Sequence, residues 1–186
     1  VNASGSEVDE VNLAAGEKPV KVSADVYELI KLGLKYSEEF DGAFDITVGP
    51  LTALWHIGFD DAKKPTQEEI DAVLPLVNYK DVELNDAEQT VFLKKKGMQL
   101  DLGGIAKGYI ADKVWEYFAK EGITTAVIDL GGNIVVMGGS PARDGVAWNV
   151  GIQDPDASRG KTLGTILEKD KTIVTSGIYE RYLTVD

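Results

Sequence analysis

The spacing of apolar residues changes near Thr124, and this change limits the fold more than any other feature of the sequence. Before it, apolar residues recur about every 3.6 positions, which predicts helices over 22–40, from Thr66 onward and over 105–120. After it, short apolar runs separated by Gly- and Asp-rich turns predict strands over 125–130, 133–137, 148–153, 162–167, 172–175 and 179–185. Strands joined by short turns pair antiparallel, so we expect an α+β fold with helices packed on one face of the sheet.

Local signals support these elements. Ser23 is a suitable N-cap for the first helix, Thr66 and Glu69 have the spacing of a capping box, and Gly122 suits the left-handed residue that follows a helix. Two further short β-rich runs, 81–84 and 90–94, are separated by a polar turn and predict a hairpin.

Composition excludes several classes of protein. The chain has 186 residues, 44% of them apolar, which suits one domain over 1–186. A net charge of −12 argues against nucleic-acid binding, which requires clustered Lys and Arg. Without cysteine the chain has no disulfide, thiolate nucleophile or Cys-ligated metal. The apolar runs fall far short of the roughly 20 residues that a membrane helix needs.

The segment from Asp101 to Tyr109 combines a strand end, two glycines and a helix start. Bare glycines allow close approach of a ligand, and a helix N-terminus offers N–H groups to phosphate oxygens. Lys107, in the first helical turn, is disfavoured there by the helix dipole unless it meets an anion. The alternative is a tight strand-to-helix turn with a solvated lysine.

Two other segments could carry chemistry. Phe44 and Asp45 lie between the turn signals Asp41-Gly42 and Gly49-Pro50, in a loop that could hold a planar ring. The alternative makes Phe44 a core residue and Asp45 a turn cap. The run over 173–182 brings hydroxyls, a Tyr and an Arg together and could bind an anion, or it is a hairpin with a polar face. His56, the one histidine, receives no role.

Together and in this order, the segments resemble the ApbE family of FAD:protein FMN transferases. The resemblance covers nearly the whole chain, and its specificity comes from the combination of motifs. They are DGAFDITVGPL at 41–51 followed by Leu54-Trp55, DLGGIAKGY at 101–109 followed by Ala111-Asp112, Asn133 after Gly131-Gly132, Thr-Ser-Gly-x-Tyr-x-Arg at 175–181, and an early SEVDEVN at 6–12.

The resemblance implies a T-fold-like antiparallel sheet and a set of ligand contacts. It implies transfer of FMN from FAD to a Thr or Ser hydroxyl of an acceptor protein, with Mg²⁺ required and AMP released. By position, FAD contacts fall on Ala43, Phe44, Asp45, Asp101 and Lys107. The residue that lends an oxygen to Mg²⁺ falls on Gly104, whose backbone carbonyl is its only oxygen. The resemblance identifies no general base among these residues.

The family pattern continues beyond this sequence into a His-x-Ile-Asp-Pro segment and an Asp-rich motif that supplies further Mg²⁺ ligands. We therefore expect the 186 residues to be an incomplete portion of a longer enzyme. Family members usually act outside the cytoplasm as lipoproteins, so we expect membrane association only through a lipid anchor that this sequence lacks. Two alternatives remain: a surface lipoprotein that binds FAD without chemistry, and a structural or adhesive module that binds no flavin.

Overall fold

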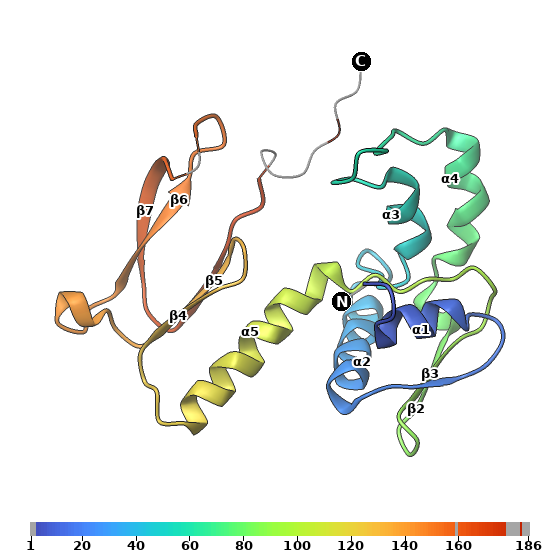
Figure 1. Cartoon of the computed structure of the whole chain (residues 1–186), viewed down its shortest axis with the longest axis horizontal. Coiled ribbons are helices and arrows are strands. Elements are labelled where there is room, and N and C mark those ends of the chain that lie inside the picture. The colour runs from blue at the N-terminus through green and yellow to red at the C-terminus, as the bar shows by residue number, and fades with distance from the viewer. Residues whose placement is uncertain (1–2, 159, 178–182, 184–186) are drawn as a thin grey trace. The chain divides into compact units, whose positions relative to one another are not determined.

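The computed structural model describes residues 3–158, 160–177 and 183 (Figure 1). They form two compact units, which divide between Ala106 and Lys107. Each unit contains helical segments and antiparallel strands, which confirms the α+β class. The expectation of a single domain over 1–186 stays a prediction.

The first unit is mainly helical and has a small sheet. Strands β1 (Val20–Lys21), β3 (Thr90–Leu93) and β2 (Val82–Asn85) pair antiparallel in that spatial order, and β2 and β3 form the predicted hairpin. The helices are α1 (Glu7–Leu13), α2 (Ala24–Glu39), α3 (Gly49–Trp55), α4 (Gln67–Val73) and the start of α5 (Gly103–Lys120), with 3₁₀ turns at Leu74–Leu76 and Tyr79–Asp81.

The core of this unit gathers residues from several of these elements and from the loops that carry the predicted site. α1 lies against β3 (Figure 1). The largest fully buried apolar side chains are Val8 and Val11 of α1, Ile30 of α2, Val91 and Leu93 of β3, and Ile46, Met98, Leu100 and Leu102 of the loops. Their burial anchors the backbone on which Asp45 and Asp101 lie.

The second unit is a sheet covered on both faces. Strands β4 (Ala126–Asp129), β5 (Asn133–Met137) and β8 (Lys171–Val174) pair antiparallel, while β6 (Trp148–Gln153) and β7 (Thr162–Glu168) form a separate ribbon. Side chains alternate along β5: Val135 packs with Ala111 of α5, and Val136 packs with Val150 of β6. α5 therefore covers one face of the central sheet, as the sequence predicts.

The helix caps follow the sequence signals with one difference. Thr66 and Glu69 form both hydrogen bonds of the capping box, and Gly122 has a φ of +76° after α5. Ser23 is the N-cap residue of α2, but its hydroxyl makes no cap bond. It donates instead to Glu7 of α1, over 2.8 Å, and so connects two helices.

Two helices were not expected from the sequence. The Gly49-Pro50 pair indicates a turn in the sequence, but α3 begins there with Pro50 in its first turn. Proline is tolerated at this position because the first N–H groups of a helix have no partner within the helix. α1 follows Ser6, whose hydroxyl accepts the Asp9 amide over 3.2 Å.

α5 begins at Gly103, two residues before the predicted start. The strand predicted over 179–185 falls mostly outside the described residues. In the part of the chain that the structure describes, no helix is long and apolar enough to cross a membrane.

Gly49 provides a test of the packing in the first unit. A Cβ built on Gly49 would lie 2.6 Å from the Gln99 carbonyl oxygen and 2.9 Å from its carbonyl carbon, both backbone atoms that cannot easily move. We expect Gly49→Ala to lower the free energy of unfolding by about 1–3 kcal/mol, as overpacked sites do. Urea unfolding measures this change.

Gly108 is the matched control, because a Cβ there meets no atom within 4 Å. Gly108→Ala removes a glycine from the interior of α5, and we expect it to raise the free energy of unfolding by about 0.5–1 kcal/mol. Equal effects of the two substitutions would contradict the close packing at Gly49.

Candidate functional site

The segment 99–101 is held by two other parts of the first unit, α1 and the segment 46–49. The side-chain amide of Asn12, in α1, accepts the Leu100 N–H at 2.7 Å and donates to the Leu100 carbonyl at 3.1 Å. The Gly49 N–H donates to the Gln99 carbonyl at 3.2 Å, and the Asp101 N–H donates to the Ile46 carbonyl at 2.8 Å. The 46–49 and 99–101 segments thus run side by side, with a parallel bridge between Val48 and Gln99.

Asp101 is the last residue of this segment, and its side chain binds the first amide of α5. One carboxylate oxygen accepts the Gly103 N–H at 2.9 Å, and the other accepts the Thr52 hydroxyl at 2.9 Å. The Asp101 side chain is therefore oriented by both the helix that follows it and α3. The sequence predicts free N–H groups at this helix start, but the first of them, that of Gly103, is already bound by Asp101.

Phe44 and Gly104 meet at the same helix start. A Cβ on Gly104 would lie 3.2 Å from the Phe44 ring carbon Cε2, so the bare glycine allows the half-buried ring to lie close to α5. Ala43, next to Phe44, is exposed. Four of the predicted FAD-contact residues, together with Gly104, therefore belong to the first unit. Asp101, Phe44 and Gly104 surround the start of α5.

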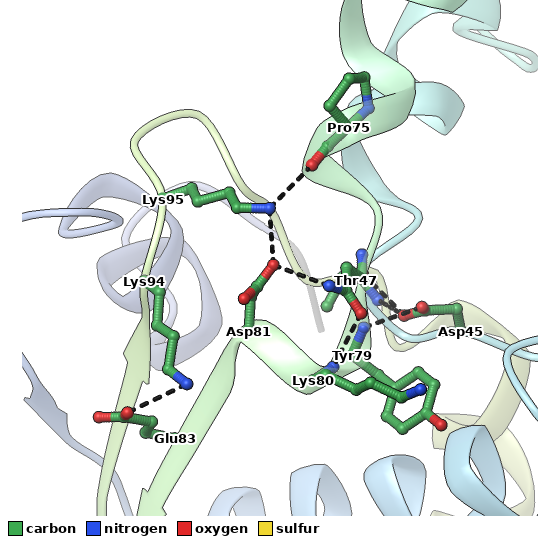
Figure 2. Close-up of polar contacts among 10 residues, drawn as sticks. Asp45, Thr47, Pro75, Tyr79, Lys80, Asp81, Glu83, Lys94 and Lys95 are labelled. Atoms are coloured by element: carbon green, nitrogen blue, oxygen red, sulfur yellow. Dashed lines mark hydrogen bonds and ion pairs between the residues drawn. The ribbon is translucent and has the colours of Figure 1, made fainter.

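Asp45 has a structural role, which the sequence indicates only as the alternative that Asp45 caps a turn. One of its oxygens accepts the Thr47 N–H at 2.8 Å and the Thr47 hydroxyl at 2.7 Å, and the other accepts the Tyr79 N–H at 3.0 Å. Thr47, which is fully buried, in turn accepts the Asn78 N–H at 2.8 Å. Figure 2 shows this carboxylate bound to the segment that precedes β2.

Asp81 holds that segment from its other end. Its carboxylate accepts Lys95 at 2.7 Å and the Asn78 side-chain amide at 2.9 Å, and Lys95 also donates to the Pro75 carbonyl at 3.3 Å (Figure 2). The hydrogen bond from Lys95 lowers the pKa of Asp81 below its ordinary value, with a smaller contribution from Asn78. Asp45 and Asp81 thus brace one short stretch of backbone.

Lys107 belongs to the second unit, where its ammonium donates to the Gly131 carbonyl at 3.2 Å. The string Asp-Leu-Gly-Gly occurs twice, at 101–104 and at 129–132, and the second copy forms the turn that Lys107 contacts. Asp129 accepts the Gly131 N–H at 3.0 Å, just as Asp101 accepts that of Gly103. Gly131 and Gly132 then adopt positive φ, whereas Gly103 begins a helix, so the two copies share only their first hydrogen bond.

The described residues do not fit a complete Mg²⁺ site. No group of three His, Asp or Glu side chains lies together among them, and Mg²⁺ requires about six oxygen ligands. Gly104 offers one carbonyl within α5, where backbone carbonyls accept helical hydrogen bonds. Its role as a metal ligand stays a prediction, as do the FAD contacts.

His56 has partners that the sequence did not predict. Its Nδ1 lies 2.6 Å from an oxygen of Asp61, and its ring stacks on Phe59 with centroids 4.0 Å apart. His56 has a φ of +46° at the end of α3, so these contacts stabilise the loop that leaves the helix. Asn12 and Thr47 were visible only as parts of motifs, and no local signal identified Thr52.

Comparison with known proteins assigns this chain to a family. The ApbE family model matches residues 1–186. An FAD:protein FMN transferase of Klebsiella pneumoniae is 40% identical over all of this chain and 56% of its own length, and one of Treponema pallidum is 37% identical over all of this chain and 54% of its length. The chain belongs to the ApbE family, and it spans about half the length of the curated relatives it matches.

Solved structures agree with the fold. The crystal structure of the ApbE protein of Thermotoga maritima has a TM-score of 0.85 and 33% identity, covering 98% of this chain and 58% of that chain. The flavin transferase ApbE of Vibrio cholerae has a TM-score of 0.78 and 30% identity, covering 95% and 57%. These matches confirm the family and the α+β fold that the sequence predicts.

The Asp81–Lys95 pair predicts a pH dependence of stability. Because the pKa of Asp81 is lower in the folded state than in the unfolded state, the pair stabilises the fold above the ordinary carboxyl pKa, about 4. That stabilisation is lost as pH falls through the lowered folded-state pKa. We expect Asp81→Asn to lower the free energy of unfolding at pH 7. Between about pH 4 and pH 2, the free energy of unfolding of this variant should fall less than that of the unmodified chain.

Urea unfolding across this pH range measures the effect, and Lys95→Met is the matched partner variant. It keeps the carboxylate and removes the cation that lowers its pKa, so it should flatten the acid dependence in the same way. An acid dependence unchanged in both variants would contradict the assignment to this pair.

Proposed function

We propose that this protein transfers FMN from FAD to a Thr or Ser hydroxyl of an acceptor protein and releases AMP. The observation that carries the proposal is the arrangement at the start of α5, where Asp101 is oriented by two hydrogen bonds and the Phe44 ring lies against Gly104. Membership of the ApbE family, whose curated relatives bear the name of this activity, supports the reaction.

Each predicted contact residue has chemistry that suits part of FAD. An ionised carboxylate accepts hydrogen bonds, so Asp101 suits the hydroxyl or N–H groups of the nucleotide. The Phe44 ring offers a face or an edge to a planar ring system. Lys107 is exposed and carries the positive charge that a diphosphate requires.

Asp45 contributes to the proposed site through the backbone. Its oxygens accept three hydrogen bonds from Thr47 and Tyr79, so its main effect on FAD binding is to fix the loop that presents Phe44. Such bracing keeps the site in its binding geometry before FAD arrives, which reduces the entropy lost on binding.

In the proposed reaction, the acceptor hydroxyl oxygen attacks the phosphorus on the FMN side of the diphosphate. A new P–O bond forms, the bond to the bridging oxygen breaks, and AMP leaves with that electron pair. The hydroxyl proton passes to a base that we do not assign among the described residues. The Mg²⁺ requirement belongs to the proposal through the family resemblance, and we assign no step to the ion.

The cellular setting is proposed on the same resemblance. We propose an extracytoplasmic location with a lipid anchor as the attachment to the membrane. The rival function, a lipoprotein that binds FAD without reacting it, shares the binding residues and differs only in chemistry. AMP release separates the two, because binding alone cannot break the diphosphate.

The test is incubation of the protein with FAD, Mg²⁺ and an acceptor protein. We expect a flavin-fluorescent acceptor band that survives a denaturing gel, together with one AMP for each flavin transferred. Asp101→Ala should reduce the rate by about tenfold or more, since it removes a charged hydrogen-bonding partner. The measurements are in-gel fluorescence and chromatography of AMP.

Asp71→Ala is the matched control. It removes an exposed carboxylate of α4 that accepts the Gln67 side-chain amide, and the variant should transfer flavin at the unmodified rate. Bound FAD with neither a fluorescent band nor AMP would contradict the transferase proposal and favour storage. Absence of FAD binding would contradict both.

A further inference from the structure

Thr52 connects α3 to Asp101, and nothing in the family resemblance assigns it a role. Its hydroxyl lies 2.9 Å from Oδ2 of Asp101 and 3.1 Å from the carbonyl oxygen of Gly49, three residues earlier in the same helix. The side chain is exposed and Asp101 is half-buried, so this pair lies where a ligand can reach it.

The two acceptors compete for one proton, because a threonine hydroxyl has a single O–H to donate. The carboxylate is charged and the carbonyl is neutral, and hydrogen bonds to charged groups are roughly twice as strong. The hydroxyl therefore points to Asp101 in the ligand-free protein. The Gly49 carbonyl, close by, is a second acceptor to which the hydroxyl can turn.

The carboxylate of Asp101 is bound on both of its oxygens. Gly103 N–H holds Oδ1 from the start of α5, and the Thr52 hydroxyl holds Oδ2 from α3. A single hydrogen bond would allow the carboxylate to rotate about χ2, a torsion with a broad energy profile. Among the described residues, two donors from different helices orient the plane of the group.

We propose that Thr52 is a positioning residue for FAD binding, which fixes the Asp101 carboxylate in the orientation that receives a hydroxyl or N–H group of the nucleotide. This inference rests on the proposed function, in which Asp101 contacts FAD. The inference also restricts which part of FAD binds next to Asp101. The negatively charged carboxylate binds hydrogen-bond donors of the nucleotide and repels its diphosphate. Thr52 itself need not touch the nucleotide.

The test compares Thr52→Val, which has nearly the same shape and no hydroxyl, with Thr52→Ser, which keeps the hydroxyl. We expect Thr52→Val to raise the Kd for FAD about fivefold to twentyfold, because an Asp101 carboxylate that is less firmly oriented binds its partner on the nucleotide less well. Thr52→Ser should stay within about threefold of the unmodified protein, since the donor remains. Flavin fluorescence titration measures Kd, and Thr165→Val, an exposed change on β7, is the matched control that should leave it unchanged.

A second readout does not depend on FAD. Loosening Asp101 also weakens its bond to the Gly103 N–H, so Thr52→Val should speed exchange of that amide about threefold or more, and Thr52→Ser should restore it. Magnetisation-transfer NMR of the ligand-free protein measures this rate. Urea unfolding of each variant shows whether the fold is intact.

The outcomes separate this inference from the proposed function. If the unmodified protein binds FAD and Thr52→Val binds it equally well, the positioning role is wrong and the transferase proposal stands. If Thr52→Ser is as weak as Thr52→Val, the effect is steric and the role is also wrong. If the unmodified protein does not bind FAD, the proposed function fails. Unchanged Gly103 exchange in Thr52→Val would then contradict the orientation of Asp101 by Thr52 as well.

Discussion

The candidate site depends on the close approach of two backbone segments, 46–49 and 99–101. Gly49 permits that approach because a side chain there would collide with the Gln99 backbone. Asn12 secures it from a third direction by bonding both polar groups of Leu100, a residue that is 1% exposed. Buried backbone groups must be paired, so these contacts determine the path of the chain into Asp101.

The position of each site residue follows from that approach. Asp101 leaves the fixed segment and caps α5, while Thr52 reaches it from the helix that Gly49 begins. The Asp45 carboxylate fixes the neighbouring loop in a similar way, because it accepts the backbone N–H groups of Thr47 and Tyr79. The first unit therefore presents Phe44 and Asp101 on braced backbone, as a preformed binding site requires.

Much of the fold could be predicted from local patterns. The spacing of apolar residues predicts α2 and the strands from β4 onward, and the capping box predicts α4 because its two hydrogen bonds lie within four residues. α3 was not predicted because Gly-Pro is typical of turns, whereas here the helix begins at Gly49 with Pro50 in its first turn, where its missing N–H costs nothing.

The residues of the candidate site come from sequence motifs, but their geometry could be predicted only in part. The motif around Asp101 predicts a ligand-binding turn and contains Gly103, whereas Thr52, the second donor to the Asp101 carboxylate, lies outside it. Asn12 and Leu100 are 88 residues apart, and Thr52 is 49 residues from Asp101, so no local pattern joins them. Asp45 shows the same limit, because two of its hydrogen bonds come from nearby Thr47 but the third comes from Tyr79, 34 residues away.

The free energy of unfolding of Asn12→Ala tests the central claim most directly. The substitution leaves the Leu100 N–H and carbonyl without their side-chain partner in a buried place, and each unsatisfied group costs about 1–3 kcal/mol. We expect a loss of at least about 2 kcal/mol in urea unfolding, against a few tenths for Asn149→Ala at an exposed position of β6. Equal stability of the two variants would contradict the claim that Asn12 secures the segment leading into Asp101.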